Sequence, residues 1–194
     1  MNTHEQLLAF TFRGLLVDEA LERAGRFRPV LMSASIDEEV AKRVSLDLLP
    51  AESIARARRM ATVYIAITAF ENSLRNLVVD TLLEKVGESW WDSAVSEGVR
   101  KKAESRKEEE NRIRWHTPRG ESIISYTEFG DLASIILNNW NHFEDLLHSV
   151  DWLKGIVKPI ERSRNVIMHG GDLQPEDIER VGVAIRDFSR QVGI

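Results

Sequence analysis

The sequence contains no cysteine and no long apolar run, and each absence excludes a class of protein. Without cysteine the chain has no disulfide, no thiolate zinc site and no thiol nucleophile. No stretch approaches the ~20 apolar residues that a membrane-spanning helix needs. The start, MNTHEQLLAF, lacks the basic beginning and the apolar stretch of a signal peptide. We therefore expect a cytoplasmic protein without a membrane segment.

An excess of positive charge is also lacking. Lysine and arginine number 26 against 31 aspartates and glutamates, which gives a formal net charge of -5. Proteins that coat nucleic acids through bulk charge are usually basic, so any contact with RNA would depend on a local patch. The segments RARR (56–59) and RKK (100–102) are the best candidates, unless they are simply exposed surface. The residues concerned are Arg56, Arg58, Arg59, Lys101 and Lys102.

Several common catalytic patterns are missing as well. The sequence has no His/Asp/Glu cluster with metal-ligand spacing, no glycine-rich phosphate loop and no Gly-x-Ser-x-Gly motif. We therefore expect neither a metal ion nor a cofactor.

What the sequence does contain is helical periodicity almost throughout. With 43% hydrophobic residues the chain can bury a core, and their spacing of three and four predicts an all-α protein. We expect an N-terminal helical extension over 1–50 and a helical domain over 51–194. The longest helix should cover 51–86 and measure ~50 Å. Other helices are expected over residues 4–24 and 35–49, from about 126 to 140, from Asn141, from Asp151 to His169, and from about 175 to the C-terminus.

Residues 96–114 differ from the rest because they are dense in both charges and nearly free of apolar side chains. Such a segment is typical of a solvated helix or a flexible insertion. A charged surface for RNA or a partner is the alternative. WHTPRGES (115–122) should then form a loop.

The segment ERSRNVIMHGG (161–171) combines an arginine and a histidine at a predicted helix end. Arg164 and His169 are separated by ~7.5 Å along a helix and by about 140° around it, so they do not share one face. Their side chains could still converge on one group beside the helix. Arginine can grip a phosphodiester through two N–H groups, and an imidazole can donate or accept a proton near neutral pH. The pair could therefore cleave RNA without metal, using the 2'-hydroxyl as nucleophile.

A structural explanation of this pair also exists. An Arg-x4-His match arises easily by chance in a chain rich in arginine. His169 could simply favour the helix dipole, and Arg164 could form a surface ion pair.

Longer segments add a family resemblance. RNVIMH resembles the Arg-Asn-x3-His signature of the HEPN superfamily (higher eukaryotes and prokaryotes nucleotide-binding domains). YIAITAFENSLRNLVVDTLLEKVGESWW resembles the long Glu-x3-Arg helix and tryptophan pair of one HEPN variety, and YTEFGDLASIILNNWNHF resembles its intervening segment. That variety accompanies PIN nucleases in mRNA surveillance proteins and occurs alone in bacteria. The resemblance covers about 60 to 190.

The resemblance implies a HEPN-like helical bundle and a metal-independent endoribonuclease. Such proteins form homodimers in which two signature helices build one composite site. Arg164 and His169 would be the catalytic pair, and Asn165 would orient them or the phosphate. A toxin, phage-defence or RNA-surveillance role is implied, with an antitoxin or operon-encoded partner. The tyrosine that nucleotidyltransferase partners modify in some relatives is replaced here by Gly171, which argues against that regulation.

Three further residues and the tryptophans complete the predicted site and core. Glu71 and Arg75 stand at i, i+4 and either form a structural pair or support the active cleft. Glu161 either orients Arg164 or pairs at the surface.

A non-catalytic HEPN module that binds a partner protein or a nucleotide is the alternative function. Four tryptophans should be core or interface anchors rather than base-stacking platforms: Trp90, Trp91, Trp140 and Trp152.

Overall fold

The computed structural model describes Val17 and residues 34–193, and the chain divides into two units, Met1–Ile54 and Ala55–Ile194. The helix expected over 4–24 lies outside the described residues, apart from Val17, which is helical. In the first unit, α2 (Ala34–Arg43) and the short 3-10 helix η1 (Leu46–Leu48) replace the single helix expected over 35–49. The break occurs at Ser45, whose φ of 55° is left-handed and cannot continue an α-helix.

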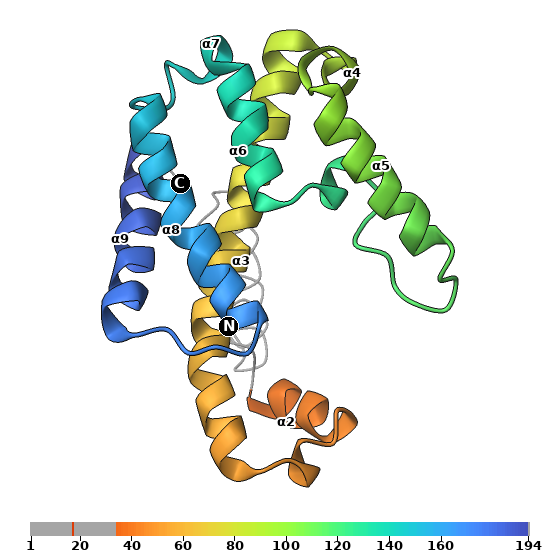
Figure 1. Cartoon of the computed structure of the whole chain (residues 1–194), viewed down its shortest axis with the longest axis vertical. Helices are drawn as coiled ribbons and strands as arrows, with labels where there is room; N and C mark the ends of the chain where they lie inside the picture. Colours follow the sequence, from red (N-terminus) through yellow and green to blue (C-terminus); the bar gives the residue numbers. More distant parts are fainter. Residues whose placement is uncertain (1–16, 18–33, 194) are drawn as a thin grey trace, which may run out of the picture. The chain divides into compact units, whose positions relative to one another are not determined.

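Every regular element of the described residues is helical, which confirms the all-α prediction (Figure 1). None of the helices in these ranges is both long and apolar enough to cross a membrane. After α3 (Ala51–Val86) the chain forms α4 (Trp90–Ala94), α5 (Glu97–Asn111), η2 (Ile123–Tyr126), α6 (Phe129–Asn138), α7 (Trp140–Phe143), α8 (Val150–Met168) and α9 (Pro175–Val192).

The long helix α3 confirms the prediction for residues 51–86, and its part from Ala55 onward lies in the second unit. Its buried apolar residues recur every three or four positions, so they form one face. The helix ends at Gly87, which adopts a φ of 91° and donates its N–H to the carbonyl of Leu83. The buried apolar residues are Met60, Val63, Ile67, Phe70, Leu74, Val78 and Leu82.

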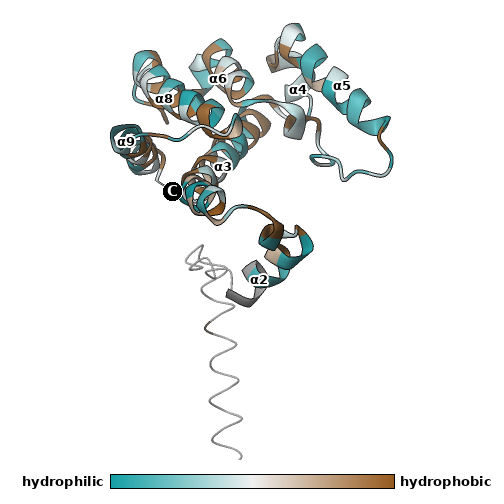
Figure 2. Ribbon diagram, turned by 60° about the horizontal axis from the view of Figure 1, so that its bottom comes forward, coloured by the Kyte–Doolittle hydropathy of each residue, from teal (hydrophilic) through white to brown (hydrophobic). Residues whose placement is uncertain are grey.

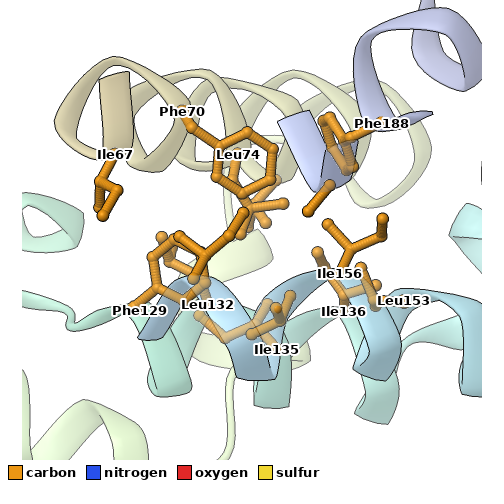
Figure 3. Packing of buried hydrophobic residues seen from close by; sticks show 14 of the residues in the cluster. Ile67, Phe70, Leu74, Phe129, Leu132, Ile135, Ile136, Leu153, Ile156 and Phe188 are labelled. Carbon is orange, nitrogen blue, oxygen red and sulfur yellow. The ribbon is translucent and has the colours of Figure 1, made fainter. Parts of the chain in front are cut away.

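The core of the second unit lies where α3, α6, α8 and α9 meet (Figure 3). The ring of Phe70 lies 5.8 Å from that of Phe129 on α6 and 4.9 Å from that of Phe188 on α9. Leu153 and Ile156 extend this cluster from α8. Burying each such side chain contributes about 1.5–3 kcal/mol, so the core fixes α8 relative to α3.

The charged segment forms the helix α5, and Figure 2 shows its mostly hydrophilic surface. Only Val99 and Ala103 are buried. A polar anchor adds to them, because Arg106 donates to the Tyr126 carbonyl (2.9 Å) and to the Asp131 carboxylate (2.8 Å). α5 is therefore a docked helix and not a flexible insertion.

Two helix starts differ from the predicted ones. The helix expected from Asn141 is the single turn α7, after which the chain bends to bury Leu147. α8 begins earlier than expected, because the Ser149 hydroxyl accepts the Trp152 N–H at 3.1 Å and caps the helix in place of Asp151. α8 then packs against α6 and α9 and contains Pro159.

Candidate active site

The predicted catalytic segment occupies the C-terminal end of α8, where a specific motif terminates the helix. His169 is the C-cap residue, and Gly170 follows with a φ of 73°. The N–H of Gly170 donates to Ile167 and that of Gly171 donates to Val166, which is the hydrogen-bond pattern of a Schellman motif. Gly170 supplies the left-handed conformation at no steric cost. The motif ends the helix directly behind an exposed His169.

Gly171 is required for a different reason. A Cβ added there would lie 2.8 Å from the Val166 side chain and 3.0 Å from its carbonyl oxygen. A side chain at this position would therefore have to displace backbone.

The Arg164 side chain reaches the long helix α3. Its Nε lies 3.5 Å from Oε2 of Glu71, and Oε1 of Glu71 accepts from Arg75 Nη2 at 2.9 Å. The side chains of Glu71 and Arg75 are only 13% and 16% exposed, whereas that of Arg164 is 29% exposed. One carboxylate thus holds two guanidinium groups in a half-buried cluster with a net positive charge.

This contact differs from the surface ion pair that was the structural alternative for Arg164. Only the Nε edge faces Glu71, and the Arg164 guanidinium donates no hydrogen bond within the described part of the chain. Arginine has five N–H donors in a planar fork. The remaining donors can therefore receive a phosphate without breaking the Glu71 contact.

Glu161 lies elsewhere. Its Oε1 would be 3.0 Å from a Cβ added at Gly130, so the carboxylate rests against the first turn of α6. Within residues 34–193 it forms no ion pair. The structure thus brings Glu71, Arg75 and Arg164 together but does not bring Glu161 to Arg164.

Asn165 and His169 share the exposed face of α8 with two basic residues that the sequence analysis missed. Lys158, Arg162, Asn165 and His169 follow one another at steps of four, three and four, and all are exposed. Neither basic residue forms an ion pair within the described residues. Both line a hollow of about 280 Å³ between α8 and the start of α9. The sequence contained a signal for these two residues: Lys158 and Arg162 precede the signature at helical spacing, which places them on the face of Asn165 and His169.

The predicted RNA-contact residues are all exposed but differ in their charge environment. Arg56 lies 3.6 Å from Asp172, Lys101 lies 2.6 Å from Glu97, and Lys102 lies 3.8 Å from Asp131. Arg58 and Arg59 have no such partner in the part of the chain that the structure describes.

Other side chains in the described ranges do not extend the site. No three of the His, Asp and Glu residues described here are grouped so that they could hold a metal ion. The four tryptophans predicted as anchors do pack into or against the core: Trp90, Trp91, Trp140 and Trp152.

Comparison with known families identifies the family of this chain. A family model described as Swt1-like HEPN matches residues 66–193. The match includes the Glu71–Arg75 pair, the Arg164–His169 segment, the part of α3 from residue 66 onward, and α6, α8 and α9. No curated protein and no solved structure matches the chain.

Proposed function

This chain belongs to the Swt1-like HEPN family, and on that premise we propose that it is a metal-independent endoribonuclease. The observation that carries the proposal is that the two signature residues have different surroundings. Arg164 forms an ion pair with Glu71 and keeps its N–H donors available, while His169 is exposed at the helix end. The reaction assigned to them is attack of an RNA 2'-hydroxyl on the adjacent phosphodiester.

The role of Arg164 follows from its charge and its tether. Negative charge grows on the phosphoryl oxygens as the 2'-oxygen attacks, and a preorganised guanidinium stabilises that charge. Because the Glu71 carboxylate lies 3.5 Å from Nε, it draws the guanidinium toward α3 and reduces the ordering needed when the substrate arrives. Arg75 secures Glu71 from the other side and keeps the cluster positive.

The role of His169 is proton transfer, and it also explains why a dimer is needed. A base must take the proton of the 2'-hydroxyl, and an acid must protonate the 5'-oxygen that leaves. One protomer supplies a single histidine at this helix end. Two facing signature helices would supply both groups, together with two copies of Arg164 and Asn165.

The surface around His169 suits pairing with a second copy. Met168 is 55% exposed and Val166 is 39% exposed on α8. The neighbouring stretch of α3 exposes Tyr64 and Ile65, and it runs beside the end of α8 because Met60 meets Leu173 and Glu71 meets Arg164. A homodimer across this surface would cover apolar area that the single chain leaves in water.

The cellular setting that we propose is cytoplasmic RNA cleavage in a toxin, phage-defence or RNA-surveillance system. A toxin of this kind would be paired with an antitoxin or another operon-encoded partner. RNA-backbone contacts are assigned to Arg56, Arg58 and Arg59 and to Lys101 and Lys102. The competing function is a non-catalytic module that binds a partner protein or a nucleotide.

The test is cleavage of a defined single-stranded RNA by purified protein in excess EDTA. Persistent cleavage that leaves 2',3'-cyclic phosphate ends is expected, because the 2'-oxygen is the nucleophile. His169→Ala protein prepared in parallel excludes a contaminating ribonuclease. Activity that disappears with EDTA and returns with Mg²⁺ would refute this mechanism, and no cleavage under any condition would favour the binding module.

A further inference from the structure

The loop between α5 and η2, residues 112–122, carries an exposed aromatic side chain that the proposed reaction does not use. Trp115 is 86% exposed, although the four other tryptophans lie in or against the core. Burial of a large aromatic side chain is favourable, so a tryptophan left in water needs an explanation. Figure 1 shows this loop beyond the C-terminal end of α5.

The loop is tied to the fold on both sides of Trp115, so the exposure belongs to a defined conformation. Before Trp115, the N–H of Ile113 donates to the Glu110 carbonyl at 2.9 Å. Glu110 of α5 accepts the backbone N–H of Arg119 at 3.0 Å. The Tyr126 hydroxyl donates to the Gly120 carbonyl at 3.2 Å. A Cβ at Gly120 would lie 2.7 Å from the Ser125 hydroxyl, so the loop approaches η2 too closely for another residue. These contacts hold Trp115 on the outside.

The immediate neighbours of Trp115 are cationic. Arg112 and Arg114 are exposed and form no ion pair within the described residues. The ring of His116 lies 5.6 Å from the indole in an edge-to-face arrangement, which leaves one indole face open. The nearest acids in sequence are Glu110, which pairs with Arg119, and Glu109 and Glu121, which are exposed. The loop from Arg112 to Ser122 therefore carries three arginines against the single acid Glu121.

We propose that this loop is a stacking platform for a single-stranded segment of the RNA substrate, with Trp115 stacking on a base and Arg112 and Arg114 contacting the backbone. Aromatic faces flanked by arginine bind single strands without sequence preference, because every base has a π-face. A protein partner would instead favour an apolar surround that excludes water from the tryptophan. Here the indole is surrounded by charged and polar loop residues, and only Ile113 adds exposed apolar area.

Consecutive elements connect this platform to the candidate active site. The loop leads into η2 and then into α6, and Glu161, one turn before Arg164, rests against Gly130 in the first turn of α6. A single strand stacked on Trp115 would run past η2 and the start of α6 to reach the signature. The inference rests on the proposed RNA substrate and adds where that substrate is first held.

The test separates binding from cleavage by using His169→Ala protein as the background. Binding of a fluorescein-labelled oligouridylate of about 12 nucleotides is measured by anisotropy. Adding Trp115→Ala should weaken binding by at least about five-fold, and Trp115→Phe should retain most of it, because a smaller aromatic ring still stacks. Arg112→Gln with Arg114→Gln should weaken binding and reduce its salt dependence. Lys154→Gln with Arg190→Gln makes the same change in net charge elsewhere and should have a smaller effect.

Each outcome decides one of the two proposals. Binding that depends on Trp115, together with a wild-type protein that cleaves nothing, would support the platform and reject the nuclease. Cleavage by wild type combined with equal binding by the Trp115→Ala and parent proteins would reject the platform alone. The platform would also be rejected if cells that express the Trp115→Ala protein lose a bound protein partner while the purified variant still binds RNA like the parent. Thermal melting of each variant should match the parent, because Trp115 is outside the core.

Discussion

At the scale of single residues, the two proposed catalytic side chains have opposite surroundings. His169 is exposed at a helix terminus, whereas Arg164 is half-buried against Glu71. A change at His169 should therefore act on chemistry, and changes around Arg164 should act on both chemistry and folding. Variants can separate these effects.

Replacing His169 with alanine removes the proton-transfer group and should reduce cleavage by about 10²- to 10⁴-fold. The thermal midpoint should stay close to that of wild type, because exposed positions usually change stability by less than about 0.5 kcal/mol. The measurement is RNA cleavage and melting on the same samples. His148→Ala, which changes another exposed histidine beyond α7, is the matched control and should cleave normally. Equal cleavage by both variants would make His169 a helix cap only.

Replacing Arg164 with lysine keeps the charge but loses the planar fork. Lysine has one ammonium group and cannot pair with Glu71 and hold two phosphate oxygens with the same geometry. Cleavage should fall by about 10- to 100-fold, measured as the rate constant under single-turnover conditions. Arg190→Lys makes the same exchange at an exposed position of α9 and should have no effect. A fully active Arg164→Lys enzyme would mean that a point charge suffices and that the fork has no role.

Glu71→Gln tests the carboxylate that positions Arg164. The amide keeps the shape of the side chain but leaves two guanidinium groups without a counter-charge. We expect a loss of about 1–3 kcal/mol in the free energy of unfolding and slower cleavage. The comparison is Glu161→Gln, whose carboxylate rests against Gly130 and should matter less. A larger loss of stability and cleavage in Glu161→Gln than in Glu71→Gln would contradict the assignment of Glu71.

The sequence predicted this cluster only in part. It placed Glu71 and Arg75 one helical turn apart as a structural pair or a support of the active cleft. It named Glu161 as the residue that could orient Arg164, whereas the structure gives that position to Glu71. Glu161 is close along α8, but the Glu71 contact depends on how α3 and α8 pack, and helical periodicity does not contain that information.

At the scale of elements, long periodic segments were predictable and short ones were not. α3 matched its predicted range because a continuous apolar face and a terminal glycine both define it. α7 and the start of α8 did not, because their limits depend on the burial of Leu147 and on one hydroxyl of Ser149. α5 has so few apolar residues that its docking rests on Arg106 and Asp131, a contact between distant segments.

The anchor of α5 therefore makes a prediction about stability. Asp131 is 7% exposed, accepts from Arg106 and also forms the capping box of α6 with Glu128. Asp131→Ala removes both interactions and leaves Arg106 half-buried without its closest partner. The free energy of unfolding, measured by urea titration, should fall by about 2–4 kcal/mol. Glu104→Ala, which changes an exposed residue of α5, should alter the free energy of unfolding by less than about 0.5 kcal/mol. Equal stability of the two variants would show that α5 docks without this anchor.

At the scale of the whole molecule, the family and the all-α class were predictable because several segments agreed in order and spacing. The homodimer stays a prediction, since a single chain contains only the half of the site that it contributes. Its physical basis is the reaction itself, which needs a proton acceptor and a proton donor where each chain offers one histidine.

Subunit mixing tests that dimer directly. The wild-type protein should be a dimer by light scattering at the concentration used for cleavage. If each site takes residues from both signature helices, an excess of inactive His169→Ala protein should exchange into wild-type dimers and suppress their cleavage. The expected activity falls with the fraction of wild-type homodimers, because a mixed dimer retains only one of the two histidines. An equal excess of His169→Ala protein that also carries Met168→Glu is the matched control. The added charge should prevent pairing across the exposed apolar surface, so this protein should not inhibit. Two results would contradict the composite site. One is a wild-type enzyme that is a monomer. The other is cleavage that stays constant although the excess His169→Ala protein is shown to form mixed dimers with wild type.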